Sequence, residues 1–239
     1  MVFLHHSTGF NIWKGKTGNI GRIDRMRGKE YDVPAWFTDF NKTHGTNYRI
    51  TQQVFPKAKP YGWNNYPYDY YNIWVKHGNA DSYKEEPTLK TLTAKYDLII
   101  FKHCFPVSGI EADLGKADID SPEKRIENYK LQYEALKAKI HEYPETKFLL
   151  WTGAALVKGE TTPEKAARSR EFFTWVVNEW DEENDNLFLW DFYELETEGG
   201  VYLKDEYAVN NNDSHPNPEF AAKAAPLFCQ RIVEVIETK

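Results

Sequence analysis

The chain has 239 residues, of which 41% are hydrophobic and 15% aromatic, and its formal net charge is −6 at pH 7. An acidic chain without a lysine or arginine cluster is a poor partner for nucleic acid, because phosphate binding requires a basic surface. No apolar run reaches the roughly 20 residues that cross a bilayer, so the sequence predicts a soluble protein without a membrane partner. We expect one domain over residues 1–239, with an aromatic-rich insertion at 55–89.

The start of the chain and its cysteines bear on the compartment. The first predicted strand begins at Val2, and nothing before it could serve as a signal peptide. As given, the chain is expected in the cytoplasm, or in the periplasm or outside the cell if a leader has been removed ahead of Met1. Cys104 and Cys229 are too few for a disulfide framework, and we expect two buried free thiols. Nothing in the sequence indicates the oligomeric state.

Apolar runs alternate with helical patterns along most of the chain. In order, we expect a strand at 2–6, an irregular segment over 10–33, a helix at 34–43, strands at 48–54 and 96–102, a helix at 121–143, a strand at 147–152, a helix at 162–180, a strand at 186–191 and a helix at 217–236. This alternation predicts an α/β fold, a three-layer α/β/α sandwich with a mainly parallel five-stranded sheet. Ligands bind at the carboxyl ends of the strands in such sheets.

Three of the helices carry the same start signal, an N-cap residue followed by proline and an acidic residue. The three segments are Ser121-Pro122-Glu123, Thr162-Pro163-Glu164 and Asn217-Pro218-Glu219.

The insertion at 55–89 is rich in aromatic side chains interspersed with amides and carboxylates. Its rings are Tyr61, Trp63, Tyr66, Tyr68, Tyr70, Tyr71 and Trp74. Such rings stack on sugars whose hydroxyls bind neighbouring polar groups, or they form a satellite core that holds the loop in place. Both interpretations stay open, and Trp63 and Tyr68 are the candidate substrate contacts.

Ser7 follows the first predicted strand, in the segment His5-His6-Ser7-Thr8-Gly9. A hydroxyl at the carboxyl end of a buried strand is typical of a nucleophile in α/β enzymes, although a serine there can also satisfy local backbone groups. Near the other end of the chain, Asn212-Asp213-Ser214-His215-Pro216 offers an imidazole and a carboxylate. Together the two segments contain the parts of a serine hydrolase triad.

These two segments and the five alternating strands resemble the SGNH (GDSL-type) hydrolase superfamily, as a divergent bacterial group with His-His-Ser-Thr-Gly at the nucleophile. The resemblance implies a flavodoxin-like fold and makes Ser7 the nucleophile and His215 the base. Here His5-His6 replaces the usual Gly-Asp before the serine, and the usual acid position, three residues before the histidine, holds Asn212. We therefore expect Asp213 to be the acid, with Asp191 as a more distant alternative.

The oxyanion donors that the resemblance implies, a glycine N–H and an asparagine amide, have no clear counterpart. The backbone N–H of Ser7 is the first candidate, and the others are Asn11, Gly62 with Asn64, and Asn65. Candidate substrate contacts besides Trp63 and Tyr68 are His6, Lys102, His103 and Asn212. The predicted reaction is hydrolysis of a small acyl ester, on a small molecule or a carbohydrate, without a cofactor.

Two other functions remain possible on the sequence alone. His5, His6, His215 and Asp213 are ligand types that zinc accepts, which would fit a metal-dependent hydrolase, but neighbouring strand residues point to opposite faces. We therefore expect no metal site. The second alternative is a carbohydrate-binding protein that keeps the fold without a working triad.

Overall fold

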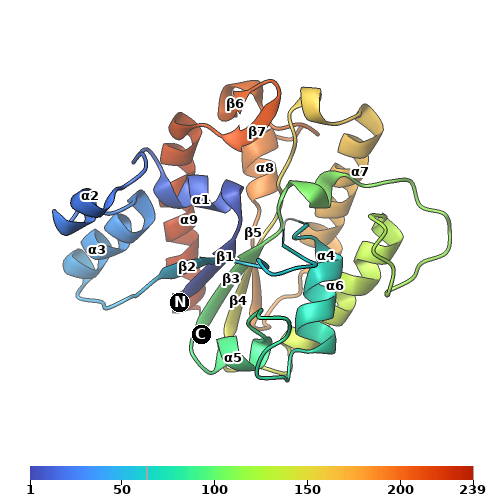
Figure 1. The fold of residues 1–239 in the computed structure, drawn as a ribbon, viewed down its shortest axis with the longest axis horizontal. Helices are drawn as coiled ribbons and strands as arrows, with labels where there is room; N and C mark the ends of the chain where they lie inside the picture. The colour runs from blue at the N-terminus through green and yellow to red at the C-terminus, as the bar shows by residue number, and fades with distance from the viewer. Residues whose placement is uncertain (63, 239) are drawn as a thin grey trace.

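The computed structural model describes residues 1–62 and 64–238, and its centre is a five-stranded parallel sheet (Figure 1). The strands are β1 (Val2–His5), β2 (Thr51–Val54), β3 (Leu98–Lys102), β4 (Lys147–Trp151) and β5 (Leu187–Trp190). Their order is β2-β1-β3-β4-β5, the flavodoxin-like order. Each strand lies where the sequence predicted one, and every pairing is parallel.

Helices cover both faces of this sheet, which confirms the three-layer α/β/α fold. One face carries α1 (Ser7–Lys14), α3 (Asp32–His44) and α9 (Pro218–Glu237), and the other carries α6 (Ile126–Ile140) and α7 (Pro163–Trp175). Strand residues alternate between the two layers, so Leu4 packs with the α6 side and Phe3 with the α9 side. The shorter helices are α2 (Arg22–Met26), α4 (Pro67–Tyr70), α5 (Leu89–Thr93) and α8 (Phe192–Thr197).

Two of the three predicted helix starts are confirmed. The Thr162 side chain accepts a hydrogen bond from the backbone N–H of Lys165, and Asn217 accepts one from Phe220. The prediction at Ser121 is wrong, because α6 begins at Ile126. Arg125, just before α6, has extended backbone and forms an isolated parallel bridge with Glu111, whose N–H donates to the Lys124 carbonyl at 2.7 Å.

The expected irregular segment over 10–33 is wrong at its beginning, because α1 runs from Ser7 to Lys14. Gly9, which suggests a turn in the sequence, lies within this helix. A Cβ at Gly9 would stand 2.5 Å from the Cβ of His5, so glycine allows α1 to pack directly on β1. Gly15, with φ of +58°, ends the helix by donating its N–H to carbonyls of the last turn.

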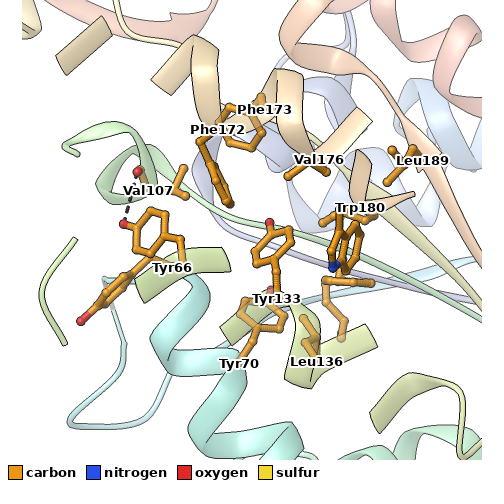
Figure 2. Packing of buried hydrophobic residues seen from close by; sticks show 14 of the residues in the cluster. Tyr66, Tyr70, Val107, Tyr133, Leu136, Phe172, Phe173, Val176, Trp180 and Leu189 are labelled. Carbon is orange, nitrogen blue, oxygen red and sulfur yellow. Dashed lines mark hydrogen bonds between the residues drawn. The ribbon is translucent and has the colours of Figure 1, made fainter. Parts of the chain in front are cut away.

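The aromatic insertion belongs to the core on the α6 side. After α4 it continues as a π-helix over Tyr71–Lys76, and Tyr70 and Trp74 are fully buried. Tyr66 and Tyr70 lie in the same cluster as Tyr133 of α6 and Phe172 of α7, as Figure 2 shows. The core interpretation is therefore confirmed for the buried rings, which are Tyr61, Tyr66, Tyr70, Tyr71 and Trp74. Trp63 lies outside the described residues.

Both cysteines are buried free thiols, as expected. Within the described part of the chain, no helix combines the length and the apolar character that a bilayer span requires.

Candidate active site

Ser7 is the first residue of α1, immediately beyond the end of β1. His6 occupies the N-cap position with extended backbone, so the chain passes from strand to helix within one residue. This abrupt change is possible because α1 packs against β1 at Gly9. It places the Ser7 side chain at the carboxyl edge of the sheet, where α/β proteins build their sites.

His215 reaches Ser7 from a hairpin that the sequence did not predict. The hairpin pairs β6 (Ala208–Asn210) with β7 (Asp213–Pro216), and α9 begins just after it. The Ser7 hydroxyl donates to Nε2 of His215 at an Oγ–N distance of 2.8 Å. Nδ1 of His215 donates to Oδ1 of Asp213 at 2.5 Å, and the His215 backbone N–H donates to the same oxygen at 3.0 Å. Ser7, His215 and Asp213 therefore form one continuous hydrogen-bonded chain.

Strand geometry explains why an acid two residues before the histidine meets the imidazole. Residues i and i+2 of a strand share a face, so Asp213 and His215 project to the same side of β7. Asn212, three residues before His215, lies in the exposed hairpin turn, where its N–H donates to the Asn210 side chain. The carboxylate of the alternative acid, Asp191, is engaged elsewhere: it caps α8 by accepting the Glu194 N–H, and it accepts the Thr152 hydroxyl at 2.8 Å.

Ser214 lies between the acid and the base, and its side chain points to the opposite face of β7. It is buried, and both its hydroxyl and its backbone N–H donate to the Glu160 carboxylate. The same hydroxyl accepts the Val157 N–H at 3.0 Å. Glu160 belongs to the 3₁₀ turn Lys158–Glu160 that follows β4. The Glu160 carboxylate therefore holds β7 from the face opposite His215, and the sequence analysis did not select this residue.

The environment of the His215–Asp213 pair favours an ionised carboxylate. Burial raises the pKa of Asp213, whereas the hydrogen bonds from the backbone N–H and the ring of His215 lower it. The lowering effects together are larger, so the pKa of Asp213 lies below its ordinary value. Phe105, in the 3₁₀ turn after β3, stands edge-on to the imidazole with ring centroids 4.9 Å apart. The His215 side chain keeps 32% of its surface exposed and Asp213 keeps 39%, so a large molecule can approach the pair.

Of the five candidate oxyanion donors, the Ser7 backbone N–H belongs to the same residue as the hydroxyl and lies in the first turn of α1. The first intrahelical hydrogen bond of α1 runs from Phe10 N–H to the His6 carbonyl, and the N–H groups of a first helical turn have no intrahelical acceptor. They also carry the positive end of the helix dipole. Asn11 lies one turn away, and its amide donates to the Pro216 carbonyl at 3.4 Å, which ties α1 to β7.

The candidates from the insertion are wrong as oxyanion donors. The N–H of Gly62 donates to the Ala58 carbonyl at 3.0 Å within a local turn. Asn65 is fully buried and its amide donates to the Phe55 carbonyl at 3.2 Å. Both groups hold the loop together, so they are not open to a substrate oxygen.

Lys102 and His103 are corrected as substrate contacts, because both are fully buried below the edge of the sheet. The Lys102 ammonium donates to the His103 carbonyl and lies over the Trp151 ring at 5.5 Å. Burial lowers the pKa of Lys102. Burial also lowers the pKa of His103 to about 3, and its ring packs edge-on against Tyr70.

His6 is also buried, and its role is to anchor the insertion. Its Nε2 donates to the Pro56 carbonyl at 2.6 Å, which joins the start of the insertion to the residue before Ser7. Tyr68 of α4 is partly exposed beside Tyr66, with ring centroids 6.1 Å apart. Tyr68 and Asn212 are the predicted substrate contacts that the structure leaves at the surface.

The histidines considered as zinc ligands are held by other contacts. His5 is buried, its Nδ1 donates to the His6 carbonyl at 2.8 Å, and burial lowers its pKa to about 4. In residues 1–62 and 64–238, no group of three or more histidine, cysteine, aspartate or glutamate side chains is placed to hold a metal ion.

No family model matches the chain, and no curated protein matches it. Solved structures match at 13% identity, among them a family two carbohydrate esterase from Cellvibrio japonicus, with a TM-score of 0.48 over 99% of this chain and 61% of that one. A GDSL-like lipase from Bacteroides thetaiotaomicron VPI-5482 matches with a TM-score of 0.44 over 98% of this chain and 87% of the lipase chain. A gut microbial diltiazem-metabolizing enzyme matches with a TM-score of 0.46 over 96% of this chain and 45% of that enzyme's chain. This chain thus spans less than two thirds of the length of two of these proteins, and the likeness concerns the fold alone.

Proposed function

We propose that this protein is a serine esterase that removes small acyl groups, such as acetyl, from carbohydrates. The observation that carries the proposal is the hydrogen-bonded chain from Ser7 Oγ to His215 Nε2 and from His215 Nδ1 to Asp213. An aspartate that holds Nδ1–H leaves Nε2 free to take the serine proton, which is the arrangement of a serine hydrolase. The amide at Asn212, which favoured a non-catalytic protein, does not leave the imidazole without a carboxylate.

In the proposed reaction, His215 Nε2 takes the Ser7 proton as Oγ attacks the ester carbonyl. The backbone N–H of Ser7 and the positive end of α1 stabilise the oxyanion. The imidazolium then protonates the leaving alcohol, and an acyl-Ser7 ester remains. Water attacks this ester, His215 accepts a water proton and returns it to Oγ, and the carboxylic acid leaves.

The shape of the site supports an ester carried by a bulky polar molecule. About a third of the His215 and Asp213 side chains is exposed, so the pair lies at the surface instead of in a closed tunnel. The predicted substrate contacts that remain at the surface are Asn212, which precedes Asp213 in the chain, and the partly exposed Tyr68. An aliphatic tunnel would suit a lipid chain, whereas amides and an aromatic ring suit sugar hydroxyls and their C–H faces.

The test is labelling with a fluorophosphonate, followed by intact-mass measurement of the wild type and the Ser7→Ala and His215→Ala variants. We expect one adduct on the wild-type protein, none on Ser7→Ala and strongly slowed labelling of His215→Ala, because the reagent requires an activated hydroxyl. An unlabelled wild-type protein would overturn the esterase proposal. Retention of an acetylated glycan by that unlabelled protein would then favour the carbohydrate-binding function.

A second prediction concerns Glu160 as a positioning residue. Glu160→Ala removes the acceptor for two donors of Ser214, so β7 loosens and His215 spends less time against Ser7. We expect kcat for 4-nitrophenyl acetate to fall about tenfold with little change in KM. Glu160→Gln should recover most of kcat, because its amide oxygen still accepts. Glu145→Ala, at an exposed glutamate, is the control, and an unchanged kcat in Glu160→Ala would contradict the prediction.

A further inference from the structure

A groove of about 210 Å³ is lined by residues of α1 and β7 that lie close in the chain to Ser7 and His215. One wall is α1 and the segment that follows it, with Asn11, Lys14 and Lys16, and the opposite wall is the junction of β7 and α9 at Pro216. Pro216 follows His215 in the chain, and Asn11 lies one helical turn after Ser7. The groove is therefore an extension of the candidate active site along α1, and Figure 1 shows α1 next to β7 and α9.

The groove is positively charged in a chain whose net charge is −6. Lys14 and Lys16 line it, and none of its described lining residues is acidic. Within the described residues, neither ammonium group has a carboxylate within 4 Å, and that of Lys14 rests over the Phe10 ring at 5.1 Å. Two ammonium groups that form no ion pair with the described residues, in a concave site, favour a negatively charged ligand.

The loop that carries Lys16 is fixed before any ligand binds. The Asp32 carboxylate accepts the backbone N–H of Lys16 at 2.7 Å and that of Thr17 at 3.2 Å. Gly15 makes this possible, because a Cβ there would stand 2.0 Å from the Asp32 carboxylate and φ is +58°. The nearest acid is thus engaged with the backbone, and its role is to hold the loop against the groove. A fixed loop lowers the entropy lost on binding.

Helix geometry sets the distance between the reacting centre and the charge. Ser7, Asn11 and Lys14 are spaced i, i+4 and i+7, so they share one face of α1. Seven residues of helix span about 10 Å. A ligand with an ester at Ser7 would therefore present its negative charge roughly one to two sugar units away along α1.

We infer that the substrate is an acylated acidic carbohydrate, whose ester lies at Ser7 while a neighbouring anionic sugar binds in the Lys14–Lys16 groove. This inference rests on the proposed esterase function and specifies its substrate class. Lysine recognises the charge as a point and does not fix one planar geometry, so carboxylate and sulfate groups share the chemistry. Trigalacturonate, which carries carboxylates, and a sulfated disaccharide distinguish the two possible anionic groups.

The binding test uses the Ser7→Ala protein, so that it does not depend on turnover. Titration calorimetry with trigalacturonate, a sulfated chondroitin disaccharide and neutral xylotriose should show tighter binding of at least one anionic sugar. Adding Lys14→Gln and Lys16→Gln should weaken that binding about tenfold and leave xylotriose unchanged. The matched control is Lys90→Gln with Lys95→Gln, the same charge change near α5, at the opposite end of the sheet. Equal binding of neutral and anionic sugars would overturn the inference.

The kinetic test separates this inference from the proposed function. The Lys14→Gln/Lys16→Gln protein should keep its kcat/KM for neutral 4-nitrophenyl acetate and lose about tenfold on acetylated polygalacturonate at low salt. Salt at 0.5 M should remove most of that difference, since it screens exposed charges (about 4 Å Debye length). Unchanged activity on the acidic polymer would overturn the groove assignment while esterase activity stands. Wild-type rates of 4-nitrophenyl acetate hydrolysis by Ser7→Ala would instead overturn the proposed function as a serine esterase with Ser7 as its nucleophile.

Discussion

Ser7→Ala and His215→Ala are each expected to lower kcat/KM for 4-nitrophenyl acetate by a factor on the order of 10⁴ to 10⁶. The 2.8 Å contact makes the hydroxyl and the imidazole one functional unit, since the serine is a weak nucleophile until Nε2 takes its proton. The double variant should therefore lose no more activity than either single variant. Steady-state kinetics with matched melting temperatures is the measurement, and losses that multiply would show that the two residues act independently.

The carboxylate should contribute less than the nucleophile and the base. Asp213→Asn keeps a polar partner near Nδ1 but cannot stabilise the imidazolium, so we expect a loss of roughly 10²- to 10⁴-fold in kcat. Asn212→Asp is the matched control, because residue 212 lies in the exposed turn. Adding that acid to Asp213→Asn should restore little activity. Full restoration would place the functional acid at residue 212 and contradict the geometry of β7.

Acid should destabilise the protein strongly, through two buried histidines. Burial lowers the pKa of His5 to about 4 and that of His103 to about 3, against 6.5 in the unfolded chain. The unfolded state therefore binds more protons, and stability present above pH 6.5 is lost as the pH falls toward the folded pKa values. At pH 4.5 each histidine is expected to cost roughly 2 to 3 kcal/mol of unfolding free energy.

Urea unfolding between pH 7.5 and 4.5 measures this loss. His103→Phe should reduce the pH dependence by about half, because phenylalanine fits among Tyr70 and Tyr133 and cannot be protonated. Among the described residues, neither ring nitrogen of His103 has a hydrogen-bond partner, so little stability should be lost at neutral pH. His44→Gln, on the exposed end of α3, is the control. An unchanged pH slope in His103→Phe would show that His103 is not the titrating group.

The sequence was sufficient to predict those elements whose conformation depends on the local residue pattern. Four of the five strands, β1, β3, β4 and β5, are mainly apolar and buried, as expected for parallel strands covered on both faces, whereas the edge strand β2 is polar and largely exposed. The alternation of strands with helices predicted the layers and the parallel direction of the sheet. Thr162 and Asn217 marked helix starts because a cap acts within three residues. The positions of Ser7 and His215 relative to strand and helix also followed, since sheet topology brings loop residues to one edge.

Tertiary contacts decided the rest, because those contacts join residues far apart in the chain. Asp213 contacts the imidazole of His215 because residues 213–216 form a strand. That strand depends on its pairing with β6 and on the hydrogen bonds between Ser214 and Glu160. α6 begins at Ile126, where the preceding residue Arg125 pairs with Glu111, and not at the N-cap signal Ser121-Pro122-Glu123. Lys102 ends β3 and His103 follows it, where the sequence predicted surface residues, yet both are fully buried. Tyr70 of the insertion and Tyr133 of α6 pack against His103, and Lys102 lies over the Trp151 ring. Burial is a property of the assembled layers, so neither residue type nor spacing could reveal it.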